Sequence, residues 1–434
     1  MLRSLSSGVS GLRNQQVRLD VIGNNIANVN TVGYKAHRVN FQEQFSQTLR
    51  GGSAPNGSLG GTNPTQVGLG VTVGSIDLMM GQGSLNPTGK NTDLAISGEG
   101  FFVISDGKQQ VYTRDGAFDF DRSGNLVKIS NGFRVMGWNA QMQPDGSAAV
   151  DTSRAPEALV VPAGTTLNPQ MTSFIKMGSN LEQQSVDGTI ARSSVTMYDS
   201  AGNVHKGAIT FTKNGTNTWD VAFTPDNAGD FSGGPYNLGK ITFDDKGVLA
   251  TNTMPTPSLH LDPATVGAFS PLDITIDVGT IGKTDGLTQF SDPKSDASTK
   301  FFNQTAVMVD QNGYSSGALS GVSIGSDGKM IGNFTNGRTR ILGQVAMATF
   351  TNPVGMAVNG DNIFSATPNS GEPQVGIAGS GSRGLIAPGS LENSNVDLAQ
   401  SFSDLIVAQR GLQSNSKIIT TSDEVLQELM SLKR

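Results

Sequence analysis

Apolar residues recur at every seventh position near both ends of the chain. The positions that share this spacing are Leu5, Leu12, Leu19, Ile26, Leu398, Leu405, Leu412, Ile419 and Leu426. A seven-residue repeat is typical of helices that bury a narrow seam against other helices. We therefore predict two terminal helices that pack against each other or against other copies of the chain. A purely intramolecular role is the competing interpretation for any one of these residues.

The second apolar position of each heptad becomes polar along the chain. Gln16 and Gly23 occupy it near the start, and Gln409, Ser416 and Asp423 occupy it near the end. One interpretation is that the polar residues weaken helix pairing, so that the helices become ordered only within an assembly. The alternative is that these positions face a channel or solvent, and the sequence leaves both open.

The first helix is predicted to start near Leu2 and to end around Asn28, since the residues that follow include the helix-stopping Asn30, Thr31 and Gly33. An amphipathic stretch occupies 38–49, and 50–70 is rich in Gly, Pro and Asn. We interpret 31–70 as a linker or extended arm.

The last helix is predicted to begin near Asn395. Ser394 or Asn395 is the expected N-cap, because short polar side chains accept hydrogen bonds from the first free backbone N–H groups. Asp397 then falls in the first turn, where a negative charge is favourable.

Between the helices, short apolar runs are separated by turn residues, as in β architecture. The clearest predicted strands are 101–104, 118–120, 135–138, 207–212, 218–223, 273–278 and 341–350. Hairpins are predicted where acidic or small residues and a Gly lie between apolar flanks, at 118–127, 196–205, 241–250 and 322–331. The 55 Gly and the aromatic content of 6% agree with this interpretation. The predicted fold is mainly β with terminal α-helices.

Charge and cysteine content exclude several classes of function. The net charge of −6 favours neither nucleic acid nor anionic membranes as partners. The absence of Cys excludes disulfides, thiolate metal sites and cysteine nucleophiles. Residues 1–29 lack the apolar core of a signal peptide, and no stretch is long and apolar enough to span a membrane. Protein partners are therefore expected.

Three short motifs imitate catalytic or binding sites. Residues 119–130 resemble the start of a calcium loop, but Ser130 stands where a bidentate Glu is required. Residues 321–325 spell GxSxG, yet all three histidines, His37, His205 and His260, precede them. Residues 379–384 spell GxGxxG, but Pro388 forbids the long helix that should follow. We predict no catalytic residue, no cofactor and no metal site.

The terminal segments carry a family resemblance. Residues 19–35, LDVIGNNIANVNTVGYK, together with SGVSGL at 7–12, resemble the N-terminal motif of the rod, hook and hook-associated axial proteins of the bacterial flagellum. Residues 389–434 resemble the C-terminal motif of the same family. The residues that match the N-terminal motif are Asn24, Asn25, Asn28, Asn30, Thr31, Gly33 and Tyr34. Their amides and glycine suit a helix exit whose backbone groups need capping.

Three further segments, 92–104, 112–127 and 342–367, resemble the domain that builds the tube wall in hook and distal rod proteins. The block 151–304, which the shorter distal rod protein is expected to lack, resembles only by its position and composition the domain that a hook subunit carries outside that wall. The resemblance therefore implies a structural, non-enzymatic subunit of the flagellar hook, a self-polymerising flexible tube that acts as a universal joint and transmits torque from rod to filament. A distal rod or other axial protein is the alternative, and a secreted hydrolase or adhesin is a remote third.

The resemblance also implies a nested multi-domain subunit. Residues 1–30 and 395–434 would pair as an inner coiled-coil layer, 71–150 and 305–394 would form a middle β domain, and 151–304 would form an outer β domain. The implied partners are copies of the chain itself, the rod protein below, the hook–filament junction protein above, and the hook cap and export apparatus during assembly. The implied location is the extracellular flagellum, reached without a cleavable signal peptide and without membrane insertion.

Overall fold

The computed structural model describes residues 2–55, 57, 60–143, 148–162, 164–227, 229–232, 236–256, 258–263, 270–291 and 304–431. The chain divides into two compact units. The first consists of Met1–Ala163, Val322–Gly332 and Arg340–Arg434, and the second of Gly164–Gly321 and Asn333–Thr339. The first unit therefore contains both ends of the chain. The layer boundaries expected from the sequence stay a prediction.

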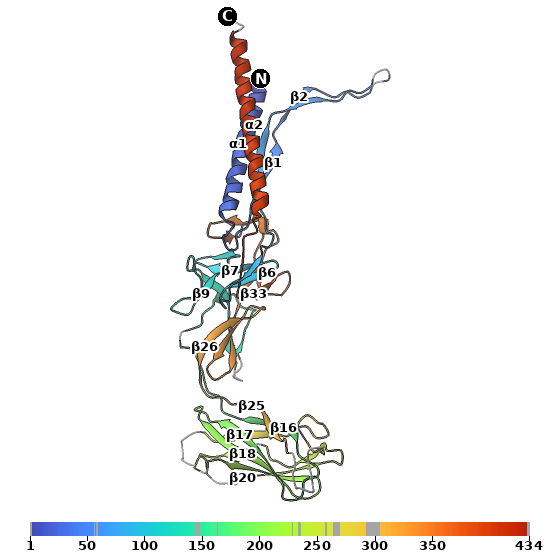
Figure 1. The fold of residues 1–434 in the computed structure, drawn as a ribbon, viewed down its shortest axis with the longest axis vertical. Helices are drawn as coiled ribbons and strands as arrows, with labels where there is room; N and C mark the ends of the chain where they lie inside the picture. Colours follow the sequence, from blue (N-terminus) through green and yellow to red (C-terminus); the bar gives the residue numbers. More distant parts are fainter. Residues whose placement is uncertain are drawn as a thin grey trace. The chain divides into compact units, whose positions relative to one another are not determined.

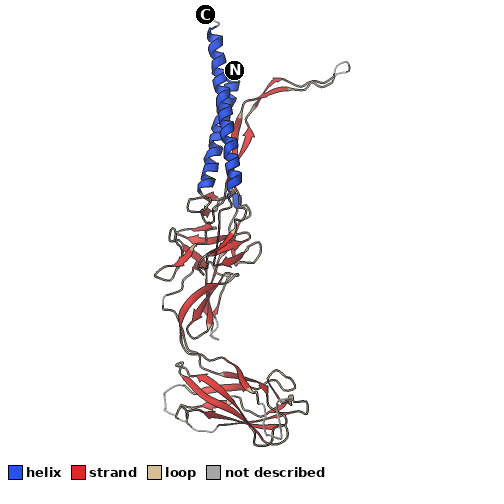
Figure 2. Ribbon diagram, in the orientation of Figure 1, coloured by secondary structure: helices blue, strands red, loops and turns tan. Residues whose placement is uncertain are grey.

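Two terminal helices lie side by side in the first unit (Figure 1). They are α1 (Leu2–Ala27) and α2 (Leu398–Ser431). The hydroxyls of Ser4 and Ser422 lie 3.4 Å apart, and Arg18 contacts Asp404 at 2.9 Å, so the helices run antiparallel. The mainly β fold with paired terminal helices is confirmed, as the colouring by secondary structure shows (Figure 2).

The expected N-cap of the last helix is wrong. The helix begins at Leu398, and Asp397 caps it by accepting a hydrogen bond of 3.1 Å from the backbone N–H of Gln400. Asp397 is the last acceptor before the helix, three residues ahead of the N–H that it satisfies. Ser394 and Asn395 precede Asp397 in the chain, and their side chains make hydrogen bonds with other groups.

The segment between α1 and the β region forms strands. β1 (His37–Glu43) pairs antiparallel with β4 (Val71–Leu78), and β2 (Ser46–Arg50) pairs antiparallel with β3 (Thr65–Gly68). The amphipathic stretch 38–49 is thus extended. All side chains of β2 and β3 are exposed, and Figure 1 shows their ribbon leaving the helical pair, as an extended arm would.

The β region of the first unit buries apolar side chains in a hydrophobic core. Its central sheet runs in the order β28, β11, β7, β8, β31 and β30, and the core includes Phe101, Tyr112, Trp138, Phe350 and Phe364. The elements of this region are β5 (Leu85–Pro87), β6 (Leu94–Ser97), β7 (Phe101–Ser105), β8 (Gln110–Thr113), β9 (Phe118–Phe120), β10 (Leu126–Lys128), β11 (Arg134–Asn139), β12 (Gln141–Met142), β13 (Ala148–Ala149), β14 (Glu157–Ala158), β28 (Thr339–Val345), β29 (Met347–Thr349), η1 (Pro353–Gly355), β30 (Ala357–Val358), β31 (Ile363–Ser365), β32 (Gln374–Gly376), β33 (Leu385–Pro388) and β34 (Ser390–Glu392). Two further strands, β26 (Gly317–Ile324) and β27 (Lys329–Phe334), contain residues of both units, as β28 does through Thr339.

The last strands before α2 pair with early strands of the chain. β33 pairs antiparallel with β6, and β34 pairs antiparallel with β5. The segment that leads into α2 is thereby held by hydrogen bonds against residues that follow α1 by some sixty positions in the chain. Both helices therefore emerge from one hydrogen-bonded framework.

The second unit is built from two sheets. One is antiparallel, in the order β17, β18, β19, β20 and β21; in the other, β16 is parallel to β23 and β24 and antiparallel to β25. Burial alternates along β17, β18 and β19, so that one face of the first sheet covers a core containing Trp219 and Phe211. The strands of this unit are β15 (Thr166–Leu167), β16 (Phe174–Asn180), β17 (Ile190–Tyr198), β18 (Val204–Lys213), β19 (Thr218–Pro225), β20 (Tyr236–Phe243), β21 (Leu249–Asn252), β22 (Leu259–Leu261), β23 (Leu272–Asp277), β24 (Leu287–Thr288) and β25 (Val307–Gln311).

The strands expected from apolar alternation are present, with one difference. The predicted run 341–350 is divided between β28 and β29. The hairpins expected at 118–127, 196–205 and 241–250 are confirmed by the antiparallel pairs β9–β10, β17–β18 and β20–β21.

Candidate functional site

Small residues allow α1 and α2 to approach closely. A Cβ atom added at Gly11 would lie 2.8 Å from Nδ2 of Asn415, and one added at Gly411 would lie 3.2 Å from the side chain of Gln15. Ala408 is fully buried at the same interface. The centre of the helical pair is therefore a seam of small residues, and larger side chains would push the helices apart.

The heptad residues predicted as seam residues flank this centre. Eight of them are half-buried, namely Leu5, Leu12, Leu19, Ile26, Leu405, Leu412, Ile419 and Leu426. The ninth, Leu398, is 41% exposed. Each therefore keeps free surface in the single chain. Whether other copies cover that surface stays a prediction.

The second heptad positions lie mostly on the outside of the helical pair. Gln16, Gly23, Gln409 and Asp423 are exposed, and Ser416 is half-buried. In the single chain, Gln16, Gly23, Gln409 and Asp423 therefore lie outside the buried contact between α1 and α2.

The residues of the N-terminal motif form a polar network where α1 ends. The buried amide of Asn25 donates to the carbonyl of His37 at 2.8 Å and accepts from the backbone N–H of His37 at 2.9 Å. The hydroxyl of Tyr34 donates to the same amide oxygen at 3.2 Å. Burial raises the pKa of Tyr34 and lowers that of His37. Asn25 thus joins the last turn of α1 to the start of β1.

The other asparagines of the motif hold the helix exit itself. Asn28 donates to the carbonyl of Asn24 at 2.9 Å, and its own amide oxygen accepts a bond of 3.1 Å from the hydroxyl of Thr31. Asn24 donates to the hydroxyl of Tyr34 at 3.3 Å. Asn30 is exposed. These bonds satisfy backbone and side-chain groups at the helix end.

Gly33 lies where a side chain cannot fit. Its φ of +69° is in the left-handed region, and a Cβ atom would lie 2.7 Å from the backbone nitrogen of Asp115. Its N–H donates to the backbone carbonyl of Glu392 at 2.8 Å. The turn after α1 is therefore pressed against both the β region and the segment before α2.

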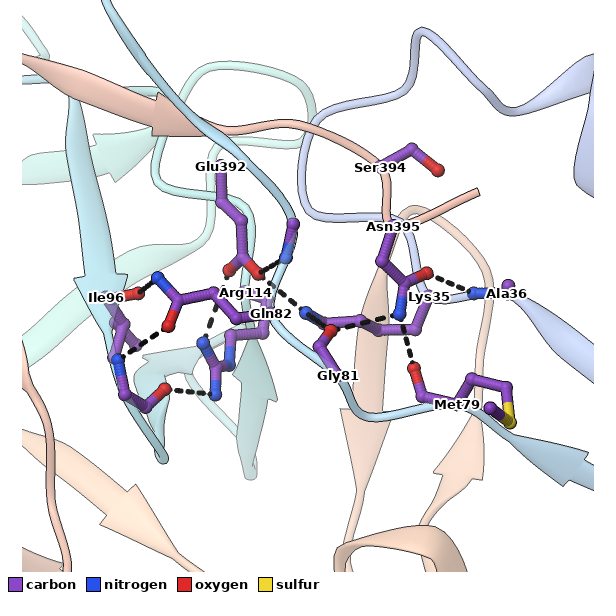
Figure 3. Close-up of polar contacts among 12 residues, drawn as sticks. Lys35, Ala36, Met79, Gly81, Gln82, Ile96, Arg114, Glu392, Ser394 and Asn395 are labelled. Atoms are coloured by element: carbon purple, nitrogen blue, oxygen red, sulfur yellow. Dashed lines mark hydrogen bonds and ion pairs between the residues drawn. The ribbon is translucent and has the colours of Figure 1, made fainter. Parts of the chain in front are cut away.

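A buried ionic cluster lies beside this turn (Figure 3). The carboxylate of Glu392 is fully buried and contacts Nζ of Lys35 at 2.6 Å and the guanidinium of Arg114 at 3.3 Å. The backbone N–H of Gly83 adds a bond of 2.9 Å to the carboxylate, and Lys35 also donates to the carbonyl of Gly81 at 2.9 Å. Burial lowers the pKa of Lys35, and the Glu392 carboxylate opposes that shift. Burial likewise lowers the pKa of Arg114.

Asn395 makes a second bridge between the same segments (Figure 3). Its amide oxygen accepts from the backbone N–H of Ala36 at 2.8 Å, and its amide nitrogen donates to the carbonyls of Met79 at 2.7 Å and Gly81 at 2.9 Å. The cluster and this bridge together fasten both helices to the β region. We call this set of contacts, from Lys35, Arg114, Glu392 and Asn395, the junction.

Sequence reasoning did not identify Lys35, Arg114 or Glu392. Each lies inside a segment that resembles the family, but Lys35 and Glu392 are separated by 357 positions. A single charged residue in a motif carries no sign of a partner at such a distance.

Family models match much of the chain. The model for flagella basal body rod protein matches residues 5–35, that for the flagellar hook protein FlgE/F/G D1 domain 95–189, that for the flagellar basal body protein FlaE D2 domain 178–314, and that for the flagellar basal body rod FlgEFG protein C-terminal region 387–432. These matches define an axial protein of the flagellum. They include the block that had been related to the outer domain only by its position and composition.

Relatives that match over their full length show which kind of axial protein this chain is. The flagellar hook protein FlgE of Borreliella burgdorferi is 40% identical and that of Treponema pallidum is 38% identical, with 100% of each chain covered. The flagellar basal-body rod protein FlgG of Bacillus subtilis is 31% identical, also with 100% of each chain covered. The chain belongs to the flagellar hook protein FlgE family, as its terminal motifs implied. It is a structural subunit of the hook, and the rod alternative is not favoured.

A solved structure shares the fold. The crystal structure of Helicobacter pylori flagellar hook protein FlgE2 matches with a TM-score of 0.50 at 14% identity, covering 71% of this chain and 100% of that chain.

Because the relative named as a rod protein spans the whole chain, the presence of 151–304 does not by itself distinguish hook from rod.

Neither described helix is apolar enough over a sufficient length to cross a membrane. Within the described ranges, no group of three or more His, Asp and Glu side chains is arranged to hold a metal ion.

Proposed function

We propose that this subunit polymerises with copies of itself into a flexible tube that works as a universal joint and transmits torque from the rod to the filament. Its partners would be the rod protein below, the hook–filament junction protein above, and the hook cap and export apparatus during assembly. It would act outside the cell without catalysis, after export without a cleavable signal peptide. In this proposal 1–30 and 395–434 form the inner layer, 71–150 and 305–394 the tube wall, 31–70 an arm, and 151–304 the outer domain.

The observation that carries the proposal is the apolar outer surface of α2. The large apolar side chains that α2 leaves exposed are Leu398, Phe402, Ile406, Val407, Ile418, Val425 and Met430. A helix that packs one side against α1 and shows apolar side chains on other sides is suited to several helical neighbours. Copies of the same chain are the neighbours that a hook subunit has. The half-buried seam residues would then complete their burial between copies.

The junction supports the torque-bearing part of the proposal. Lys35 and Glu392 have side-chain exposures of 1% and 0%, and breaking such a buried pair costs about 3–5 kcal/mol. A load applied to the helices would therefore reach the β region through buried, bonded groups. Bending would then occur mainly at contacts between copies.

The test is assembly of a charged variant. Ile406 is 50% exposed in the single chain, so Ile406→Glu should leave the monomer folded and abolish tubes seen by electron microscopy. Gln413→Glu, which adds the same charge at an exposed polar position of α2, is the matched control and should assemble. Normal tubes from Ile406→Glu would contradict the role of this surface. Bent wild-type tubes support a hook, and straight rigid ones would favour a rod.

A further inference from the structure

A groove opens beside the helical pair, between the last turns of α1, the first turns of α2 and β1. It has a volume of about 440 Å³, and its larger apolar lining residues are Val21, Ile22, Val39, Phe41, Met79 and Val396. Phe41 is 36% exposed and Met79 is 40% exposed. The volume lies within the range of about 300–1,000 Å³ that binding pockets usually have. The groove can therefore take several side chains from another molecule.

The opposite end of the helical pair carries apolar side chains without cover. Ser4 faces Ser422, so the residues of α2 beyond about 424 lie past the described part of α1. Figure 1 shows α2 continuing beyond α1 at this end. Val425 is 40% exposed there and Met430 is 75% exposed. We call residues 425–431 the α2 tip.

We infer that the α2 tip of one copy docks into the groove of the next copy along the hook. The inference rests on the proposed function, and it identifies one axial contact of the polymer. From Gln400 at the groove to Glu428 in the α2 tip, the helix rises about 42 Å at about 1.5 Å per residue. The tip therefore cannot fill the groove of its own chain.

The α2 tip and the groove are unlike surfaces at opposite ends of the helical pair. A contact between them can be repeated from copy to copy, head to tail. Such heterologous contacts build open filaments unless the rotation closes a ring. The contact between the α2 tip and the groove is heterologous in this sense, because neither surface is complementary to itself. The contact would bury apolar side chains that the single chain leaves in water.

The groove carries charges of both signs, and one exposed cation is placed to meet the α2 tip. Arg18, Arg38, Asp397 and Asp404 all line the groove, and Arg18 is paired with Asp404 at 2.9 Å. The side chain of Arg38 is 60% exposed, with its partner Asp77 at 3.6 Å. The exposed Glu428 of an incoming tip could contact Arg38. The carbonyl groups at the end of α2 carry partial negative charge, which also favours a nearby cation.

Disulfide trapping tests the contact, because the chain contains no Cys of its own. Met79→Cys combined with Met430→Cys should give a ladder of covalent multimers when assembled tubes are oxidised, since paired Cα atoms must come within about 7 Å. A second pair, Phe41→Cys with Met430→Cys, samples another groove position. Val358→Cys with Met430→Cys is the control, because Val358 is 47% exposed and does not line the groove. It should give no ladder.

The spacing of copies in wild-type tubes gives a second measurement that needs no substitution. Docking requires successive copies along the tube to repeat at about 42 Å, or slightly less if the helices are tilted. Wild-type tubes with a clearly different repeat, or oxidised tubes of both groove pairs of double-Cys variants that give no ladder, would overturn the docking while leaving the proposed function intact. A wild-type chain that forms no tubes would overturn both.

Discussion

At the scale of single residues, the junction depends on one carboxylate. Glu392 neutralises Lys35, while Arg114 shares the second carboxylate oxygen and also donates to the carbonyl of Gly98 at 2.8 Å. All three side chains are at least nine-tenths buried. A buried cation that loses its counterion keeps its desolvation cost, so this site should be far more sensitive than any surface ion pair.

Replacing Glu392 by Gln should destabilise the first unit by about 3–5 kcal/mol, because two buried cations lose their carboxylate. Urea unfolding followed by the fluorescence of Trp138, in a Trp219→Phe background, would measure the change. Asp119→Asn is the matched control: its pair with Lys90 has side-chain exposures of 53% and 42%, and its loss should cost at most about 1 kcal/mol. Equal effects of the two substitutions would contradict the role given to the junction.

Gly33 offers a second residue-scale prediction. Gly33→Ala should cost about 3 kcal/mol or more, because a positive φ and a backbone clash act together. Gly132 has a similar φ of +73° but open space around it, so Gly132→Ala isolates the conformational cost of about 1 kcal/mol. Urea midpoints of the two variants would be compared. If Gly33→Ala is no worse than Gly132→Ala, the turn after α1 is not pressed against the β region as described.

At the scale of elements, the helical pair shows what its sequence could and could not predict. Heptad spacing predicted both helices, and α1 ends at Ala27, close to the expected Asn28. The spacing did not predict the small-residue centre at Gly11, Ala408 and Gly411. Glycines interrupt an apolar pattern and weaken isolated helices, so they become favourable only when a second helix lies against them.

The β elements were predicted more fully than the junction. Alternation with a two-residue period is a local property, and it identified strands such as β18 and β19. The break between β28 and β29, and the ion pair between residues 35 and 392, arise from long-range contacts. Asp397 was mistaken for a first-turn residue because several capping side chains stand in a row before α2.

The small-residue centre predicts a strong effect of size. Ala408→Leu should destabilise the helical pair by about 1–3 kcal/mol, since the added side chain has no space between the helices. Ala399→Leu, at an exposed position of the same helix, should change little because Leu and Ala both favour helices. Thermal melting followed by circular dichroism at 222 nm would compare them. A stable Ala408→Leu variant would mean that the helices are not closely packed at this point.

At the scale of the whole molecule, the two compact units have separate cores, and each contains one of the two Trp residues. Trp138 belongs to the first unit and Trp219 to the second. This distribution gives each unit its own fluorescent reporter, provided that the other Trp is replaced by Phe.

The separate cores predict separate unfolding. In a Trp219→Phe background, Glu392→Gln should lower the urea midpoint reported by Trp138. In a Trp138→Phe background, the same substitution should leave the midpoint reported by Trp219 unchanged, because the second unit keeps its own core. Identical shifts at both reporters would show that the units unfold as one cooperative body.

The most direct test of the central claim is a cryo-electron microscopy reconstruction of the tube assembled from the full chain. The account predicts a hollow, bendable tube whose channel is lined by α1 and α2, with the β regions outside them. A tube lined by residues 164–321, or a chain that stays monomeric under all assembly conditions, would contradict the account.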